Sequence, residues 1–342
     1  MRAAIFSPYL DTLGGGERYV TSVAKAFNEK GFDVDVESKD GKIIDKLSKR
    51  FGMDLDGINV VASIKRGDGY DVCFWLSDGS VPTLYARKNI LHFQRPFFNV
   101  DGKSLLNRMK FFRINKVVVN SRFTKEWIDK EYSIDSIVVY PPIDINKFKP
   151  GKKENLILNV ARFSQLEQSK RQDVLVKAFQ RIYDSGFRNW KLILTGGSEV
   201  GRTEFVDQLI KKAKGYPIKI VENSSFEKIA DLYARAKIFW SASGFGIDEK
   251  VNPQKVEHFG ITVVEGMSAG LVPIIYNAGG HKEIVESGEN GYLWSRIEDL
   301  ISISKDMMDD SKLLKEISQR TKKDALKYSY ERFKGEILSL IK

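Results

Sequence analysis

Two carboxylates eight positions apart, Glu257 and Glu265, are the residues whose type and spacing most clearly suggest chemistry. Between them Gly260 opens an apolar run that ends at Gly270, which predicts a buried helix. The free N–H groups at the start of such a helix form an anion site that suits a phosphate. A solvated helix with two surface acids would contain the same residues, so this stretch alone leaves both interpretations open.

Two cations follow a predicted strand of the second half of the chain. Arg162 lies at the end of the predicted strand Leu156–Ala161, and Lys170 lies in the loop that follows. Cations at the carboxyl end of a strand can neutralise a diphosphate and stabilise it as a leaving group. Ordinary surface charges would look the same.

A glycine run stands between the first predicted strand and the first predicted helix. Gly14, Gly15 and Gly16 let the backbone approach a ligand closely and leave N–H groups pointing outward. The run is neither G-x-G-x-x-G nor a P-loop, which argues against a dinucleotide dehydrogenase and an NTPase. A tight turn would explain the run equally well.

Histidine and cysteine usage restricts the chemistry further. His92 lies at a predicted strand end, and a lone histidine is more often structural than catalytic; His258 and His281 lie in separate loops. We therefore predict no metal site. The single cysteine, Cys73, lies in an apolar run and cannot form a disulfide within the chain, so a reducing compartment is expected.

Strand-like and helical patterns alternate in both halves of the 342-residue chain, which exceeds the usual size of one core. Continuous apolar runs are typical of parallel strands covered on both faces, and the alternation predicts doubly wound α/β domains. A proline-marked polar stretch over 141–153 fits a linker. We expect two such domains with a ligand cleft between them, at the carboxyl ends of the strands. The predicted strands cover 3–8, 33–38, 58–62, 71–76, 89–93, 116–120, 136–140, 155–160, 190–195, 219–221, 237–240 and 272–276.

The net charge is +10, and seven cations between Lys103 and Lys125 have no acid among them. Five apolar residues are interleaved with them: Leu105, Leu106, Met109, Phe111 and Phe112. Such a surface can lie on anionic lipid, whereas a core helix with a solvated basic face would have the same pattern. We predict no nucleic-acid partner, because no helix-turn-helix, zinc-finger or RNP motif is present. No apolar stretch approaches about 18 residues, and the N-terminus is too short for a signal peptide, so a cytoplasmic protein is expected.

The order of the motifs resembles that of GT-B retaining glycosyltransferases, the glycogen-synthase-like class known as glycosyl transferases group one, or family four. The resemblance covers nearly the whole chain. It is carried by Gly14-Gly-Gly-Glu-Arg18, His92, Val119-Asn-Ser-Arg-Phe-Thr124, Val139-Tyr-Pro-Pro-Ile-Asp144, Ala161-Arg-Phe163, Lys170, the stretch from Glu257 to Glu265, Asn277-Ala-Gly-Gly280 and Tyr328-Ser-Tyr-Glu-Arg-Phe333.

The resemblance implies two Rossmann-like doubly wound α/β domains that face a central cleft, with a C-terminal helix crossing back to the first domain. The acceptor-binding domain would be 1–148 with 328–342 packed on it, and the donor-binding domain would be 149–327. The implied catalytic residues are His92, Glu257, Arg162 and Lys170. The implied donor-binding residues are Gly15, Gly16, Asn223, Ser224, Phe259, Gly260, Ile261, Thr262 and Glu265.

Each residue takes its role from the same resemblance. Glu265 would hold the ribose hydroxyls and Glu257 those of the transferred sugar, while Arg162, Lys170 and the amides of 260–262 would bind the diphosphate. Gly15 and Gly16 would close on the diphosphate from the other domain. His92 would line the reactive side of the sugar, and Asn223 and Ser224 would lie near the base. The segment from Arg162 to Lys170 is longer than in relatives, which leaves Arg171 as a competitor for the phosphate.

The nearest resemblance is to lipid-linked-oligosaccharide α-1,2-mannosyltransferases. It implies GDP-mannose as the nucleotide-sugar donor, a glycan or glycolipid acceptor, no metal or other cofactor, and attack on the face that the leaving phosphate departs from. One alternative is a UDP-sugar such as UDP-glucose with a soluble sugar or polysaccharide acceptor. Another is a non-catalytic nucleotide-sugar-binding protein. Location on the cytoplasmic face of a membrane, through the stretch 103–125, is the further expectation.

Overall fold

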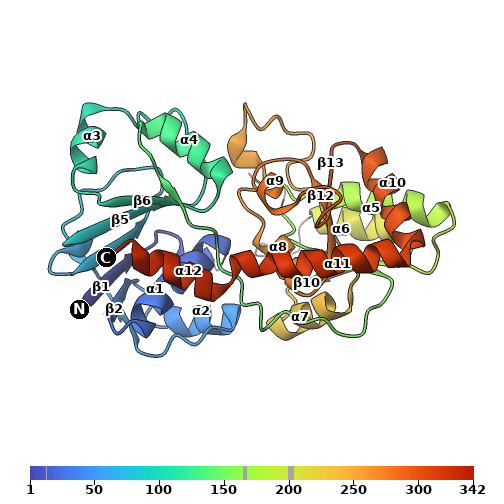
Figure 1. Ribbon diagram of the computed structural model, residues 1–342, viewed down its shortest axis with the longest axis horizontal. Coiled ribbons are helices and arrows are strands. Elements are labelled where there is room, and N and C mark those ends of the chain that lie inside the picture. The colour runs from blue at the N-terminus through green and yellow to red at the C-terminus, as the bar shows by residue number, and fades with distance from the viewer. Residues whose placement is uncertain (13, 165–167, 199–203) are drawn as a thin grey trace. The chain divides into compact units, whose positions relative to one another are not determined.

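The computed structural model describes residues 1–12, 14–164, 168–198 and 204–342 (Figure 1). The chain divides into two compact units, one formed by Met1–Pro142 with Tyr330–Lys342 and the other by Ile143–Ser329. We call them unit 1 and unit 2. The expected boundaries, at 148 and 327, lie a few residues from these. Among the described residues no helix is both long enough and apolar enough to cross a bilayer.

Unit 1 contains a seven-stranded parallel sheet in the order β3-β2-β1-β4-β5-β6-β7. Its central strands bury both faces, as in β1, where Ala3, Ala4 and Ile5 are all inaccessible to solvent. The strands are β1 (Arg2–Phe6), β2 (Asp33–Glu37), β3 (Ile58–Val61), β4 (Val72–Leu76), β5 (Lys88–Phe93), β6 (Lys116–Val119) and β7 (Ile137–Val138). The helices are α1 (Gly15–Glu29), α2 (Ile43–Phe51), α3 (Leu105–Phe111), α4 (Arg122–Tyr132) and α12 (Tyr330–Ser339), with short 3₁₀ turns at Leu10–Thr12 and Lys65–Gly67.

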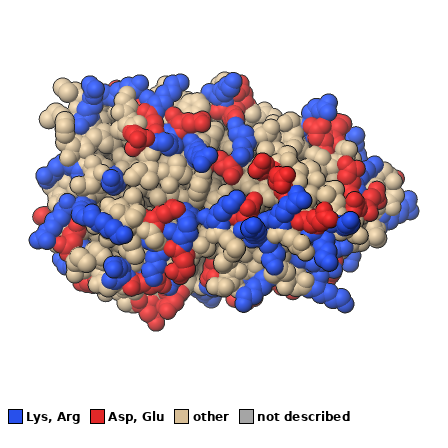
Figure 2. Space-filling model, viewed as in Figure 1, with Lys and Arg blue, Asp and Glu red and all other residues tan. Residues whose placement is uncertain are grey.

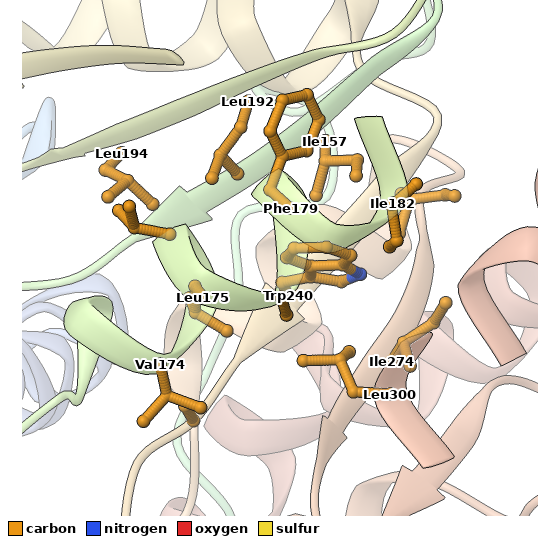
Figure 3. Packing of buried hydrophobic residues seen from close by; sticks show 14 of the residues in the cluster. Ile157, Val174, Leu175, Phe179, Ile182, Leu192, Leu194, Trp240, Ile274 and Leu300 are labelled. Carbon is orange, nitrogen blue, oxygen red and sulfur yellow. The ribbon is translucent and has the colours of Figure 1, made fainter. Parts of the chain in front are cut away.

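Unit 2 repeats this plan with six parallel strands in the order β10-β9-β8-β11-β12-β13. Phe179 of α5 and Trp240 of β11 lie in one core with Leu192 and Ile274 (Figure 3). The strands are β8 (Leu156–Val160), β9 (Lys191–Gly196), β10 (Ile218–Glu222), β11 (Ile238–Ser241), β12 (Val272–Tyr276) and β13 (Tyr292–Trp294). The helices are α5 (Gln172–Asp184), α6 (Glu204–Ala213), α7 (Phe226–Arg235), α8 (Ile261–Ser268), α9 (His281–Ile284), α10 (Ile297–Asp309) and α11 (Ser311–Ala325), with 3₁₀ turns at Pro253–Lys255 and Leu326–Tyr328.

Strand order fixes where each unit can bind a ligand. In both sheets the order reverses beside the first strand of the unit, between β1 and β4 in unit 1 and between β8 and β11 in unit 2. Ligands of open α/β sheets bind outside the carboxyl ends of the strands at such a switch point. The loop after β8 carries Arg162 and the loop after β1 carries Gly14 to Gly16, so the predicted residues occupy these positions.

Most predicted elements are confirmed, and three departures have clear causes. Strand β13 was not predicted because it is only three residues long. Helix α2 was not predicted, although Ile43 and Leu47 are buried one turn apart and Gly52 ends it in a left-handed conformation. The interpretation of the basic stretch as a core helix is wrong, because α3 buries none of its residues.

Helix α12 returns the end of the chain to unit 1. Phe333 and Ile337, four positions apart on one face, are both fully buried, and the Phe333 ring packs edge-on against Tyr19 of α1 at 5.0 Å. Arg332 donates to the carbonyl of Tyr140 at 2.9 Å. The last helix is therefore part of the core of unit 1.

We expect Phe333→Ala to lower the free energy of unfolding of unit 1 by about 3–5 kcal/mol, because it leaves a cavity against α1. Urea denaturation followed by circular dichroism measures the change. Leu326→Ala is the control, because Leu326 is 53% exposed. Equal effects of the two variants would contradict the role given to α12.

Candidate active site

An ion pair joins two of the predicted residues in unit 2. The Lys170 ammonium lies 2.8 Å from a carboxylate oxygen of Glu257, and the two side chains are only 11% and 20% exposed. Burial raises the pKa of the Glu257 carboxylate. The nearby Lys170 ammonium and the His281 and His258 imidazoles lower this pKa by more than burial raises it, so that it falls to about 2. Glu257 is therefore an anion at neutral pH and can accept hydrogen bonds from hydroxyl groups.

Two glycines hold the backbone of Glu257 in place. The amide of Gly280 donates to the Glu257 carbonyl at 2.8 Å. A Cβ atom on Gly279 would lie 2.2 Å from that carbonyl oxygen, and one on Gly280 would lie 2.3 Å from the carbonyl oxygen of His258. Both positions thus require glycine. This glycine pair therefore clamps the segment that carries Glu257.

Glu249, which sequence reasoning did not assign to the site, ties the long loop before Glu257 to this clamp. Its carboxylate accepts a hydrogen bond from the Gly279 amide at 2.7 Å and pairs with Lys282 at 2.5 Å. The contact joins positions 30 residues apart in the sequence, so no local pattern could have indicated it.

Helix α8 begins at Gly260, as predicted, and glycine is required there too. Its φ is +112°, and a Cβ atom would lie 3.2 Å from Cδ2 of His281. Two amides of the first turn bond back to the Gly260 carbonyl, those of Val263 and Val264. The amides of Ile261 and Thr262 have no acceptor among the described residues, which leaves two N–H groups for an anion.

Glu265 lies one turn further along α8 and is 6% exposed. The hydroxyl of Tyr233 on α7 lies 3.0 Å from its carboxylate and 2.9 Å from the Thr262 carbonyl. A hydroxyl carries one hydrogen, so Tyr233 donates to one of them at a time. Sequence reasoning missed Tyr233; the available signal was that a buried tyrosine hydroxyl usually needs a partner.

The structure distinguishes the two candidate phosphate cations beside Arg162. Lys170 contacts Glu257, whereas the Arg171 guanidinium donates to Asp173 at 3.1 Å and to the Phe245 carbonyl at 2.9 Å. Arg162 itself is exposed, and no described side chain pairs with its guanidinium. Lys170 and Arg162 therefore remain the cations placed for an anion.

Asn223 and Ser224 directly follow β10, on the same edge of the parallel sheet as Arg162. Asn223 has a φ of +50°, and its side chain exchanges hydrogen bonds with Ser198, accepting from the amide at 3.2 Å and donating to the hydroxyl at 3.1 Å. The Ser224 hydroxyl lies 2.9 Å from that of Thr195. These polar groups suit a base or ribose.

Unit 1 contains the remaining predicted residues. His92 is fully buried and its ring stacks on Tyr19 at 4.1 Å. Burial lowers the pKa of His92 to about 4, so the ring is neutral at pH 7. Its Nδ1 donates to the Val118 carbonyl at 3.0 Å, which makes Nε2 an acceptor. The Gln94 amide, 2.6 Å away, must then turn its NH₂ group toward Nε2.

The glycine run Gly14–Gly16 lies against Gln94, the side chain that contacts His92. Gly15 is the first residue of α1, and a Cβ atom on Gly16 would lie 3.4 Å from Cγ of Gln94. Gln94, absent from the predicted site, is therefore the side chain that links His92 to Gly16. Among the described residues no three His, Cys, Asp or Glu side chains are grouped to hold a metal ion; metal-independent transfer stays a prediction.

Two doubly wound parallel sheets of seven and six strands, with helices on their faces, make up the GT-B glycosyltransferase fold. Residues 142–324, more than half of the chain, match the family model for glycosyl transferases group 1. The chain belongs to this family.

Two curated relatives and one solved structure share between 18% and 29% sequence identity with the chain. The chain is 28% identical over 242 residues to a GDP-Man:Man(3)GlcNAc(2)-PP-Dol alpha-1,2-mannosyltransferase of Dictyostelium discoideum, covering 66% of this chain and 46% of that protein. It is 29% identical over 221 residues to a probable sucrose-phosphate synthase of Thermosipho melanesiensis, covering 63% and 50%. Anabaena Alr3699/HepE, solved with UDP and glucose, superposes with a TM-score of 0.75 at 18% identity, covering 99% and 98%. The chain thus spans about half the length of these curated relatives.

The ion pair predicts a pH dependence of stability. A carboxylate whose pKa is lowered on folding stabilises the native state above its unfolded pKa, and this contribution is lost as the pH falls through the folded value. We expect Glu257→Gln to cost on the order of 3 kcal/mol at pH 7, and the difference from the unsubstituted protein to vanish between pH 4.5 and about 2.

Urea unfolding at several pH values checks this expectation. Glu316→Gln is the control, because Glu316 is an exposed residue of α11, and it should change stability little at any pH. A Glu257→Gln difference that stays constant from pH 7 to pH 2 would show that the pair does not hold the carboxylate ionised.

Proposed function

We propose that the chain is a retaining hexosyltransferase that moves mannose from GDP-mannose to a lipid-linked or other glycan acceptor. The observation that carries the proposal is the Lys170–Glu257 pair in the segment that leads into α8. This segment combines a cation and free amides for a diphosphate with a carboxylate for sugar hydroxyls. In this proposal unit 2 binds the donor and unit 1 the acceptor.

The chemistry assigned to the site is leaving-group stabilisation. As the bond from the sugar C1 to the phosphate oxygen breaks, negative charge grows on the diphosphate. Arg162, Lys170 and the amides of 261–262 are the groups that would stabilise it. The acceptor oxygen bonds to C1 on the same face, and its proton passes to the departing phosphate. Glu257 orients the sugar, and Glu265 accepts from the ribose hydroxyls.

The choice of mannose and guanine rests on the Dictyostelium relative, whose name specifies GDP-Man and an alpha-1,2 linkage. A UDP-sugar donor is the alternative, favoured by the sucrose-phosphate synthase relative and by the Anabaena structure with UDP. The Asn223–Ser198 and Ser224–Thr195 contacts lie where the base would bind, so these side chains would decide between the two.

The donor assignment is tested by thermal shift with GDP, UDP and ADP, followed by transfer assays with GDP-mannose and UDP-glucose. We expect GDP to stabilise the protein most and GDP-mannose to be consumed. A clear preference for UDP would replace the mannosyl assignment by the UDP-sugar alternative. Nucleotide binding without turnover of either donor would indicate a binding protein.

Arg162→Ala tests the diphosphate site without disturbing the fold, because the side chain is exposed and no described residue pairs with it. We expect a loss of roughly 10-fold or more in GDP affinity, since a charge-assisted contact contributes about 1.5–3 kcal/mol. Isothermal titration calorimetry measures it. Arg171→Ala is the matched control and should bind GDP like the unsubstituted protein. An equal loss in both would place the diphosphate elsewhere.

The catalytic roles need separate variants. We expect Glu257→Ala and His92→Ala each to lower transfer strongly, in variants whose circular dichroism shows a folded chain. Transfer at the original rate in either variant would contradict its assigned role. Attachment to the cytoplasmic face of a membrane is the remaining part of the proposal.

A further inference from the structure

Helix α3 exposes an apolar stripe that the transfer reaction does not use. None of its seven residues is buried, and the exposed fractions of its large apolar side chains are high. They are 74% for Leu105, 61% for Leu106, 60% for Met109 and, at the residue that ends the helix, 90% for Phe112. Single exposed apolar residues are ordinary, but a contiguous group marks an interaction surface.

Helical spacing places these side chains together and puts cations on both sides of them. Leu105, Met109 and Phe112 are separated by four and three positions, which is one face of a helix. At about 100° per residue, Arg108 falls on one side of the stripe and Lys110 on the other. Phe111 falls on the opposite face, where its ring packs against Tyr132 at 6.0 Å.

The segment before α3 is pinned to unit 1, so the exposure is built into the fold. The Glu131 carboxylate accepts hydrogen bonds from the amides of Asn99, Val100 and Gly102 at 3.0–3.1 Å. A Cβ atom on Gly102 would lie 2.7 Å from the Glu131 carbonyl oxygen. Ser104 then caps the helix. Helix α3 is therefore held at the face that carries Phe111, with its apolar stripe exposed.

The charged residues of α3 and of the segments that flank it from 103 to 125 are all positive. No described acidic side chain pairs with Lys103, Arg108 or Lys110, and the sequence has no acid between 103 and 125. Tyr85, 46% exposed, lies beneath the Arg113 guanidinium at 5.4 Å. Figure 2 shows tan side chains at the margin where α3 lies, with Lys and Arg beside them.

An apolar stripe between cations, with a tyrosine nearby, has the chemistry of a helix that lies in the interface of an anionic bilayer. Nucleic acid would use the cations, but it offers no apolar layer for four exposed side chains. The observations therefore favour a lipid surface as the occupant.

We propose that α3 is the membrane anchor of this glycosyltransferase, with Leu105, Leu106, Met109 and Phe112 entering the acyl boundary of an anionic bilayer. Arg108, Lys110 and Arg113 contact the lipid phosphates. The anchor is independent of which sugar nucleotide is the donor, so its failure and that of the proposed reaction are separate results.

Flotation of the full chain with vesicles measures binding. We expect the chain to bind phosphatidylcholine vesicles that contain phosphatidylglycerol, and to bind pure phosphatidylcholine vesicles at least about fivefold less. The double variant Leu105→Ser with Phe112→Ser should lower binding about tenfold or more. Ile210→Ser is the matched control, because Ile210 is an exposed apolar residue of α6, and it should bind as before.

A second variant tests whether the cations beside the stripe contribute to membrane binding. Arg108→Gln with Lys110→Gln should lower binding to anionic vesicles about fivefold or more, while Lys49→Gln with Arg50→Gln, on α2 of the same unit, should not. Thermal unfolding followed by circular dichroism should be unchanged in all four variants, which shows that they are folded whichever nucleotide is the donor.

A label at the stripe reports insertion directly. Cys73 is the single native cysteine and is buried, so Phe112→Cys can be labelled selectively with an environment-sensitive dye. We expect a blue shift of its emission on addition of anionic vesicles. An unshifted emission, equal binding by the stripe variants and the controls, or retention on RNA or DNA with no vesicle binding would each overturn the proposal.

Discussion

The Lys170–Glu257 pair is the interaction on which the architecture of unit 2 depends. Removing two charges from water is costly, and a buried pair persists only where its geometry is fixed from outside. Gly279 and Gly280 fix the backbone of the anion by contact distances that admit no side chain. The Gly279 amide in turn donates a hydrogen bond to the carboxylate of Glu249, in the loop before Glu257. The conformation of several loops is thus held in place around one charge.

The two units control the charge of their buried ionisable side chains in different ways. Unit 2 keeps Glu257 ionised, because the Lys170 ammonium and two imidazoles nearby lower the pKa of its carboxylate. Unit 1 keeps His92 neutral by burying it against Tyr19. The Nε2 atom of His92 forms its hydrogen bond with the Gln94 side chain. A diphosphate needs fixed positive charge, which Arg162 and Lys170 of unit 2 would supply in the proposed reaction.

Most strands and the start of α8 could be predicted from the sequence, and the site residues that were missed share one cause. Apolar runs locate the central strands because burial on both faces leaves a local pattern, and Gly260 marks the start of α8 because only glycine adopts its backbone conformation readily. Tyr233, Gln94 and Glu249 act through partners far away in the chain or across a turn, where periodicity carries no information. The stripe of α3 has the pattern of a core helix; only tertiary packing shows that nothing covers it.

The assignment of α12 to unit 1 also orders events during synthesis. All of unit 2 lies between the two segments of unit 1, so a ribosome joins every residue of unit 2 before it adds Phe333 and Ile337. Until then the surface of α1 that receives Phe333 has no partner. Domains can fold as the chain emerges, but unit 1 is complete only after the segment Tyr330–Lys342, which follows all of unit 2, has emerged as well.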